Sequence, residues 1–372
     1  MFLTSARLNS NMTDRQIYED RMMHRLSRLL MAALKHVAFI RIHAPCFISL
    51  FARVFIAKPV PTFARHALAV VSQQVVVAIS IIAWSSTVSA DGRIPMIDAH
   101  SQIDHLVNLD VVLPTMDRAG ISRVILSTRG KRKLSDIVQL AKRHPDRITA
   151  SMRLKGRIYE KNRPEYHKRL QKMRNGRFGG MAEALIWHAK KGKKARQVKV
   201  ALSAPQVQAA LKIAKEKGWP FIVHIEFAAA GKNYAKYMNA FENFLREHPN
   251  HPMALIHMGQ LQAGEVARLI DAHQNIYFLT SHANPIVVKK SNQPWVNLFS
   301  GQKLKPDWIK LIREHSDRFI LAFDNVWAEH WGDFYVDQAK LWQKALHGLP
   351  PKAAYAVAHG NAERLWRLAS AN

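Results

Sequence analysis

The chain has 372 residues, of which 48% are hydrophobic and 22% charged, fractions typical of a globular protein. Its single cysteine, Cys46, excludes an intrachain disulfide and a cysteine-based zinc site. The formal net charge is +28, but neither an RNA-binding signature nor a zinc finger accompanies it. We therefore expect no specific nucleic-acid partner and interpret the basic residues mainly as a solvated surface.

The first 90 residues differ from the rest of the chain. Residues 1–65 form a basic leader, which we interpret as an over-extended translation start because a signal would otherwise lie unusually far from Met1. Residues 66–90 contain the apolar run ALAVVSQQVVVAISIIAW and then SSTVSA, whose Val88 and Ala90 fit a signal-peptidase site. This segment predicts a signal peptide, with an uncleaved membrane anchor as the alternative.

Export to the periplasm or the medium follows from this interpretation, and membrane contact is expected only through residues 66–90. Cleavage would leave residues 91–372. The first 90 residues carry ten of the 55 basic and three of the 27 acidic residues, so 45 basic and 24 acidic residues remain, a net charge of +21. Such a surface attracts anions.

From residue 94 onward, short apolar runs alternate with amphipathic stretches. Eight runs read as buried parallel strands, because they are apolar on successive residues. They are 94–100, 123–129, 148–154, 179–186, 221–226, 253–259, 276–281 and 319–325. Helical patterns lie between them, among them APQVQAALKIAKEKG, with Val207, Leu211 and Ala214 on one face and Gly218 as a stop signal.

Eight such repeats predict one α/β domain over residues 91–372, a (β/α)₈ TIM barrel preceded by the N-terminal signal segment. An open doubly wound sheet is the alternative, which the lack of a glycine-rich phosphate loop disfavours.

Polar residues stand at the carboxyl ends of five predicted strands, where a barrel places its chemistry. They are His100, Glu183, His224, His257 and Asp324. Imidazole and carboxylate groups suit Zn²⁺ or a similar divalent ion. A single histidine at a strand end is more often a scaffold residue, but this set on five strands indicates a metal site.

The motifs IDAHSQ, FIVHIE, MALIHMG, LAFDN and the C-terminal HGNAERLW resemble the amidohydrolase superfamily of metal-dependent barrels. The resemblance is greatest to its amidohydrolase-2 branch, which includes aminocarboxymuconate-semialdehyde decarboxylase, and it covers residues 94–368. It implies that one divalent ion, with Zn²⁺ expected, is bound by His100, His224 and Asp324. Asp324 would also accept a proton from water, and His257 would polarise the substrate or assist proton transfer.

Two departures from the family pattern affect the expected site. Gln102 replaces the second histidine of the first strand, and its amide oxygen is a weaker ligand. No lysine is expected at the end of the fourth strand, where Glu183 would serve as a weak ligand or as a neighbour of the ligands. A noncatalytic barrel that binds an anion or a partner, with a degenerate metal site, therefore stays an alternative.

Further residues are expected to bind the substrate. Arg129 and Arg153, at the ends of the second and third strands, suit a carboxylate or phosphate. Trp187 and His282 are expected at the wall of the pocket. The resemblance thus implies a hydrolase that cleaves a C–N or C–O bond of a small anionic substrate with a metal-activated water molecule. A related decarboxylase and a barrel phosphoesterase are the other enzymatic interpretations, and homo-oligomer formation is left open.

Overall fold

The computed structural model describes residues 92–192 and 195–368, so the predicted leader and signal segment lie outside the described residues. The division of the chain at residues 65 and 90 therefore stays a prediction. Within the described ranges, no helix combines the length and the apolar character that crossing a membrane requires.

Strands form at all eight predicted places, so the expectation of an α/β fold with parallel strands is confirmed. The fourth strand is divided into two short pieces. The strands are β1 (Met96–Ile103), β2 (Ile121–Thr128), β3 (Ile148–Met152), β4 (Gly180–Met181) with β5 (Ala184–His188), β7 (Phe221–Ile225), β8 (Met253–Leu255), β9 (Ile276–Leu279) and β12 (Phe319–Ile320). Nearly every residue of these strands is buried, because helices cover one side and the interior of the strand set the other.

The strands pair in two sheets, ordered β1-β2-β3-β4 and β12-β9-β8-β7-β5-β6. All pairs are parallel except that of β5 with β6 (Val198–Lys199), which form a hairpin that the sequence did not predict. A second small hairpin joins β10 (Phe299–Ser300) to β11 (Lys303–Leu304). Backbone hydrogen bonds also link the first and last strands: Ala99 N donates to Leu321 O at 3.0 Å and Asp324 N to His100 O at 2.8 Å. The last strand therefore lies beside the first.

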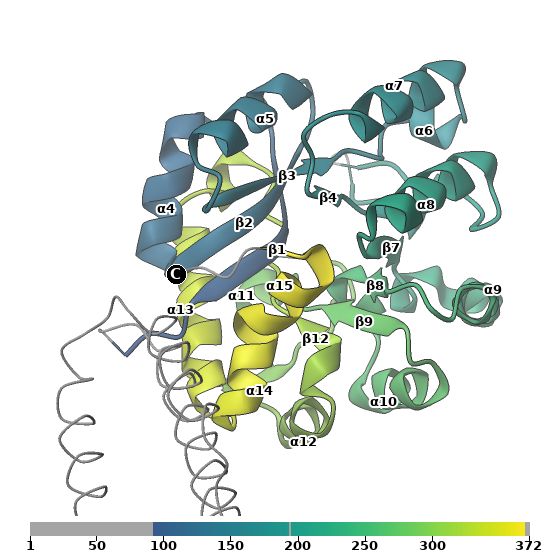
Figure 1. Ribbon diagram of the computed structural model, residues 1–372. Helices are drawn as coiled ribbons and strands as arrows, with labels where there is room; N and C mark the ends of the chain where they lie inside the picture. The colour runs from purple at the N-terminus through teal and green to yellow at the C-terminus, as the bar shows by residue number, and fades with distance from the viewer. Residues whose placement is uncertain (1–91, 193–194, 369–372) are drawn as a thin grey trace, which may run out of the picture. The chain divides into compact units, whose positions relative to one another are not determined.

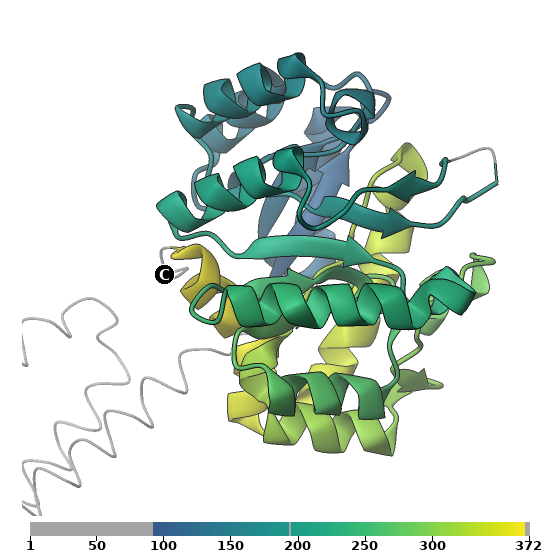
Figure 2. The same cartoon turned by 90° about the vertical axis from the view of Figure 1, so that its right-hand side faces the viewer.

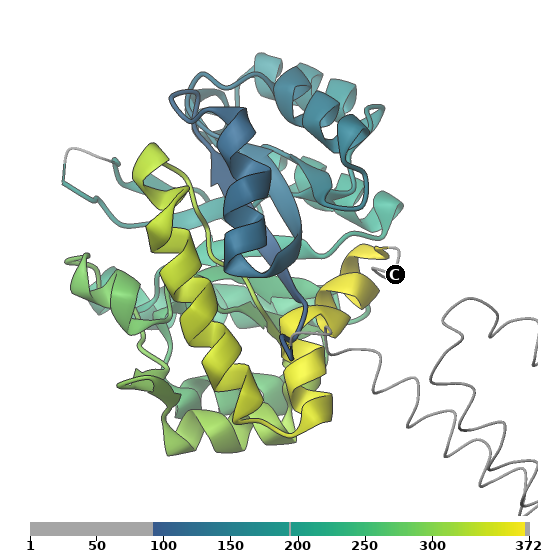
Figure 3. The ribbon, with the colours of Figure 1, turned by 90° about the vertical axis from the view of Figure 1, so that its left-hand side faces the viewer.

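Helices follow the strands in chain order and surround them (Figure 1). They are α4 (Val112–Ala119), α5 (Leu134–Arg143), α6 (Arg157–Glu160), α7 (Pro164–Arg174), α8 (Pro205–Lys217), α9 (Tyr234–Glu247), α10 (Ala263–Ala272), α11 (Pro285–Lys289), α12 (Pro306–Glu314), α13 (Asp333–His347), α14 (Pro351–Tyr355) and α15 (Asn361–Trp366). In α8 the predicted face is buried, and the helix ends at Gly218 in the left-handed conformation that favours glycine. Helices α4 and α13 lie side by side (Figure 3).

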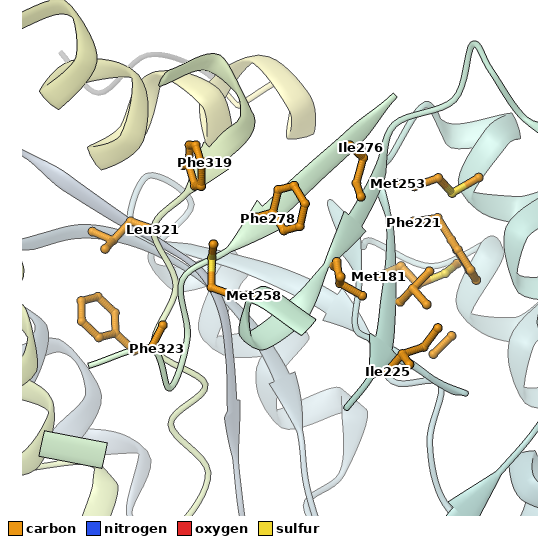
Figure 4. Close-up of a cluster of buried hydrophobic side chains, with 14 of the residues drawn as sticks. Met181, Phe221, Ile225, Met253, Met258, Ile276, Phe278, Phe319, Leu321 and Phe323 are labelled. Atoms are coloured by element: carbon orange, nitrogen blue, oxygen red, sulfur yellow. The ribbon is translucent and has the colours of Figure 1, made fainter. Parts of the chain in front are cut away.

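Two apolar clusters hold the fold together. The larger lies between strands and helices and includes Phe221, Met253, Phe278 and Phe319 (Figure 4). The smaller fills the inside of the strand set with residues such as Ile97, Ile125, Ile222, Ala254 and Leu279, and Leu365 and Trp366 of α15 join it. Helix α15 and the β5–β6 hairpin lie at opposite ends of the domain (Figures 2 and 3). Helix α15 therefore closes one end of the interior and leaves the carboxyl ends of the strands open.

The C-terminal motif HGNAERLW explains how α15 is fixed. The amide nitrogen of Asn361 donates to the carbonyl oxygens of Ser316 and Phe319, each at 2.8 Å. Both carbonyls precede or begin β12, so this side chain ties the last helix to the last strand. The motif is therefore structural at this position and leaves the chemistry to the strand ends.

Candidate functional site

A cavity of about 1060 Å³ opens at the carboxyl ends of the strands. Eight of the residues predicted for the site line it: Gln102, Arg129, Arg153, Glu183, His224, His257, His282 and Asp324. His100 lies buried immediately behind, against Glu183 and Asp324. The sequence therefore predicted the polar centre of the cavity, whereas most of its wall comes from residues that were not predicted.

A bulge in β1 turns the side chains of His100 and Gln102 toward the site. Ile97 and Ala99 point into the interior cluster, so alternation alone would turn His100 toward the helices. The pairing with β2 shifts between Asp98 and Ser101, where three residues of β1 span two of β2. The extra residue reverses the alternation, as β-bulges commonly do near active sites, and His100 and Gln102 both reach the site.

His100, Glu183 and Asp324 form the centre of the site. Nε2 of His100 lies 2.8 Å from Oε2 of Glu183 and 3.5 Å from Oδ1 of Asp324, and all three side chains are buried. Each residue offers one ligand atom within 4.8 Å of the others. Nε2 of His100 and Oε2 of Glu183 form an ion pair with each other, so these buried groups balance one another's charge in this structure.

The charged groups of this centre shift one another's pKa. Burial favours the neutral imidazole of His100, but the carboxylates of Glu183 and Asp324 outweigh it and raise the pKa of His100 to about 10. Burial would likewise raise the pKa of Glu183, yet Lys155 and His100 hold it well below its usual range. The pKa of Asp324 is also lowered against burial, chiefly by His100. Both carboxylates are therefore ionised and able to bind a cation.

Gln102 is placed differently from the prediction that its amide oxygen serves as a ligand. Its Nε2 lies 2.7 Å from Oδ1 of Asp324 and 3.4 Å from Oε1 of Glu183. Ionised carboxylates only accept hydrogen bonds, so the amide nitrogen must face them. Gln102 therefore orients the two carboxylates, while its Oε1 has no hydrogen-bond partner in the described part of the chain.

Lys155 is a site residue that the sequence reading missed. It follows β3, lines the cavity while almost fully buried, and pairs with Oε1 of Glu183. Burial lowers the pKa of Lys155 to about 8, although Glu183 opposes the shift. Its position two residues after Arg153, on the same face of the chain, was the available signal.

His257 and His282 stand on the opposite side of Asp324. Their Nε2 atoms lie 3.6 and 3.7 Å from Oδ2 of Asp324, and their rings stack with centroids 4.1 Å apart. Trp295 packs against both rings. Burial lowers the pKa of His282 to about 3 and, with the charges of His282 and His224, brings that of His257 well below its usual range. Both imidazoles are therefore neutral.

The backbone that carries these groups is unusual. His257, His282 and Asp324 have φ angles of 56°, 62° and 54°, in the left-handed region that side chains other than glycine rarely adopt. Each such residue costs about 1–3 kcal/mol, and such strain clusters at functional sites. These residues follow the ends of β8, β9 and β12 by two to four residues, and all three side chains line the cavity.

His224 belongs to a neighbouring cluster. Its Nε2 lies 3.1 Å from Oε1 of Glu226, and the same oxygen is 2.7 Å from Nζ of Lys191. The ring of His188 is 5.1 Å from that of His224. His188, His224 and Glu226 bring one ligand atom each within 4.8 Å, whereas His224 is not grouped in this way with His100. The sequence reading missed Glu226, although residues two apart on a strand share a face.

The predicted substrate-binding residues separate into two groups. Arg129 and Arg153 line the cavity, Arg129 lies 5.6 Å from the centroid of the Trp327 ring, and Arg153 donates to Gly130 O at 2.8 Å. Burial and the charge of Arg129 lower the pKa of Arg153 to about 10. Trp187 does not line the cavity: its ring packs in the outer apolar cluster and stacks on Tyr237. The prediction for Trp187 was wrong in placement because the side chain points toward the helices.

Comparisons with known proteins agree with this architecture. A family model described as amidohydrolase matches residues 59–368. An uncharacterized TIM-barrel protein from Bordetella bronchiseptica superposes with a TM-score of 0.53 and 14% identity, covering 74% of this chain and 99% of that one. At this identity the likeness shows the fold alone.

Two further solved structures have lower scores. An amidohydrolase from Burkholderia multivorans with bound zinc has a TM-score of 0.47 and 12% identity, covering 74% of this chain and 99% of that one. A 5-carboxyvanillate decarboxylase from Novosphingobium aromaticivorans with bound manganese has a TM-score of 0.44 and 13% identity, with coverages of 69% and 80%. No curated protein matches the chain. Because the family model spans most of the sequence, the chain belongs to the amidohydrolase family that its strand-end motifs indicated.

Proposed function

We propose that the protein is a metal-dependent hydrolase that cleaves a C–N or C–O bond of a small anionic substrate. One observation carries the proposal: His100, Glu183 and Asp324 hold ligand atoms within 4.8 Å of one another, buried beside a large cavity. Membership of the amidohydrolase family supports an enzyme, and the arrangement at the strand ends supports a metal as its cofactor.

The residues present fit a divalent ion. One imidazole and two ionised carboxylates form a nitrogen and oxygen donor set of the kind that zinc accepts. Nδ1 of nearby His224 is also buried beside the cavity and lacks a hydrogen-bond partner within the described ranges. We propose zinc as the ion, with four candidate ligands: His100, Glu183, His224 and Asp324.

A divalent ion at this place would polarise a substrate carbonyl and lower the pKa of a water molecule. The protein's own groups would then move the proton. Oδ2 of Asp324 faces both His257 and His282, which are neutral. Asp324 would receive the proton of the attacking water, and it or His257 would return it to the leaving group.

The charge on the cavity wall supports an anionic substrate. Arg129 and Arg153 face the cavity, and no ion pair with a carboxylate is observed for either within the described residues. Two guanidinium groups in this state suit a carboxylate or phosphate. The substrate would place its anionic group here and its scissile bond toward Asp324.

Metal content tests the proposal directly. The purified full-length protein is analysed for elements beside His100→Ala and His105→Ala, in which His105 lies near the site but does not line the cavity. We expect about one equivalent of zinc per chain in the parent and in His105→Ala, and a large loss in His100→Ala. Equal metal content in all three proteins, or none in the parent after zinc supplementation, would overturn the metal site.

The reaction is tested next with the metal-loaded protein. A panel of carboxylated amides, esters and lactones is compared with aromatic carboxylic acids that can lose CO₂. We expect the parent to hydrolyse a member of this panel and Asp324→Asn to hydrolyse none. Release of CO₂ without hydrolysis would instead make the protein a decarboxylase.

A further inference from the structure

Glu226 lies deep in the domain, directly after β7, and its carboxylate contacts three donors, one of which is His224. Its Oε1 is 3.1 Å from Nε2 of His224 and 2.7 Å from Nζ of Lys191. Its Oε2 accepts from the backbone N–H of Ala189 at 2.7 Å. The side chain is fully buried, so these three donors fix it in place.

This arrangement decides which nitrogen of His224 carries a proton. An ionised carboxylate can only accept, so Nε2 of His224 must be the donor. In a neutral imidazole the lone pair is then on Nδ1. Nδ1 of His224 is buried and has no hydrogen-bond partner among residues 92–192 and 195–368, although the side chain lines the cavity.

Glu226 could instead be a ligand itself, because it groups with His188 and His224. The contacts oppose this reading. Three donors already occupy its two oxygens, and one of them is the ammonium group of Lys191. A metal ion there would have to displace a lysine and separate Glu226 from His224.

We infer that Glu226, held by Lys191, is a positioning residue that fixes the Nε2–H tautomer of His224 and so offers Nδ1 as the ligand atom. The inference rests on the proposed function only in naming a metal ion as the recipient of that nitrogen. Ligating histidines commonly donate their second N–H to a carboxylate, and loss of such a partner costs about 10–100-fold in metal affinity. Lys191 also lies 4.4 Å from the centroid of the Trp295 ring, which further fixes its ammonium group.

The tautomer is read in the metal-free, full-length protein labelled with ¹⁵N-histidine, by long-range ¹⁵N–¹H correlation spectra. His224→Ala identifies the signals of His224. Glu226→Gln is the test variant, and Glu226→Asp is the conservative rescue. Glu160→Gln is the matched control, because Glu160 lines the same cavity and pairs with Arg196 at 2.6 Å without contacting a histidine.

The parent should show a protonated Nε2 and an unprotonated Nδ1 on His224. Glu226→Gln should mix the two tautomers, since an amide both donates and accepts, and should weaken zinc binding by about 10–100-fold. Glu226→Asp should restore the parent tautomer, and Glu160→Gln should change neither property. A protonated Nδ1 in the parent, or an unchanged tautomer in Glu226→Gln, would overturn the inference. The expected tautomers without any zinc binding by the parent would support the positioning role and overturn the proposed function.

Discussion

The buried carboxylate of Asp98 connects the first strand, the last strand and α13, and removing one of its partners should destabilise the domain. Asp98 accepts hydrogen bonds from Ser101 Oγ at 2.5 Å, Tyr335 Oη at 2.7 Å, Phe323 N at 3.1 Å and His100 N at 3.2 Å. Tyr335→Phe removes one donor and keeps the buried ring. A hydrogen bond to a charged group contributes about 1.5–3 kcal/mol. The melting temperature should fall by roughly 4–8 °C.

The loss should depend on pH in a definite direction. Burial raises the pKa of Asp98 above its usual 3.8, against its four hydrogen bonds. The protonated carboxyl of Asp98 therefore stabilises the folded state. This stabilisation is fully present below the pKa that Asp98 has in the unfolded chain, and it is lost as the pH rises through its pKa in the folded protein. Without Tyr335 the folded pKa rises further, so the variant loses more stability than the parent once Asp98 ionises. The difference in free energy of unfolding should grow as the pH rises and shrink on acidification.

Urea unfolding of both proteins, at neutral and at mildly acidic pH, measures this difference. Tyr355→Phe is the matched control, because its hydroxyl donates to Glu363 Oε2 at 3.2 Å on the surface. That variant should unfold within about 0.5 kcal/mol of the parent. The reasoning is refuted if Tyr335→Phe is as stable as Tyr355→Phe, or if its deficit is the same at both pH values.

Three further predictions concern the barrel interior, the metal and the N-terminus. Gly180→Val should cost about 1–3 kcal/mol in urea unfolding, because a Cβ there would lie 2.9 Å from the Trp366 ring; unchanged stability would contradict the packing. When the parent holds zinc at one hundred times its Kd, a chelator should lower its free energy of unfolding by about 2.7 kcal/mol. Thermal unfolding of His100→Ala should not change on adding the chelator. N-terminal sequencing of the exported protein should begin at Asp91, whereas recovery of residues 66–84 would contradict cleavage after Ala90.

The fold was predictable because buried parallel strands have a simple sequence pattern. Runs such as FIVHIE are apolar on successive residues, and their order fixed which polar residues meet at the strand ends. His100, Glu183 and Asp324 were found in this way. The family resemblance then assigned a chemistry to them, which pattern alone does not supply.

The remaining details depended on geometry that periodicity does not encode. The bulge in β1 changes which residues face inward, and the pairing shift in β5 accompanies the outward direction of Trp187. The orientation of the Gln102 amide follows from two carboxylates brought together from distant strands. Lys155 and Lys191 looked like ordinary basic residues in a chain rich in them, because only the folded structure places each beside a buried glutamate.

Helix α15 has a consequence for how the protein is made. Leu365 and Trp366 cover an interior to which β1 contributes Ile97 and Ala99, so the first and last parts of the domain complete one core. A ribosome adds about 5–20 residues per second, which separates their synthesis by tens of seconds. During that interval α15 does not yet cover its end of the apolar interior. A chain truncated before Leu365 would therefore leave this end of the interior uncovered.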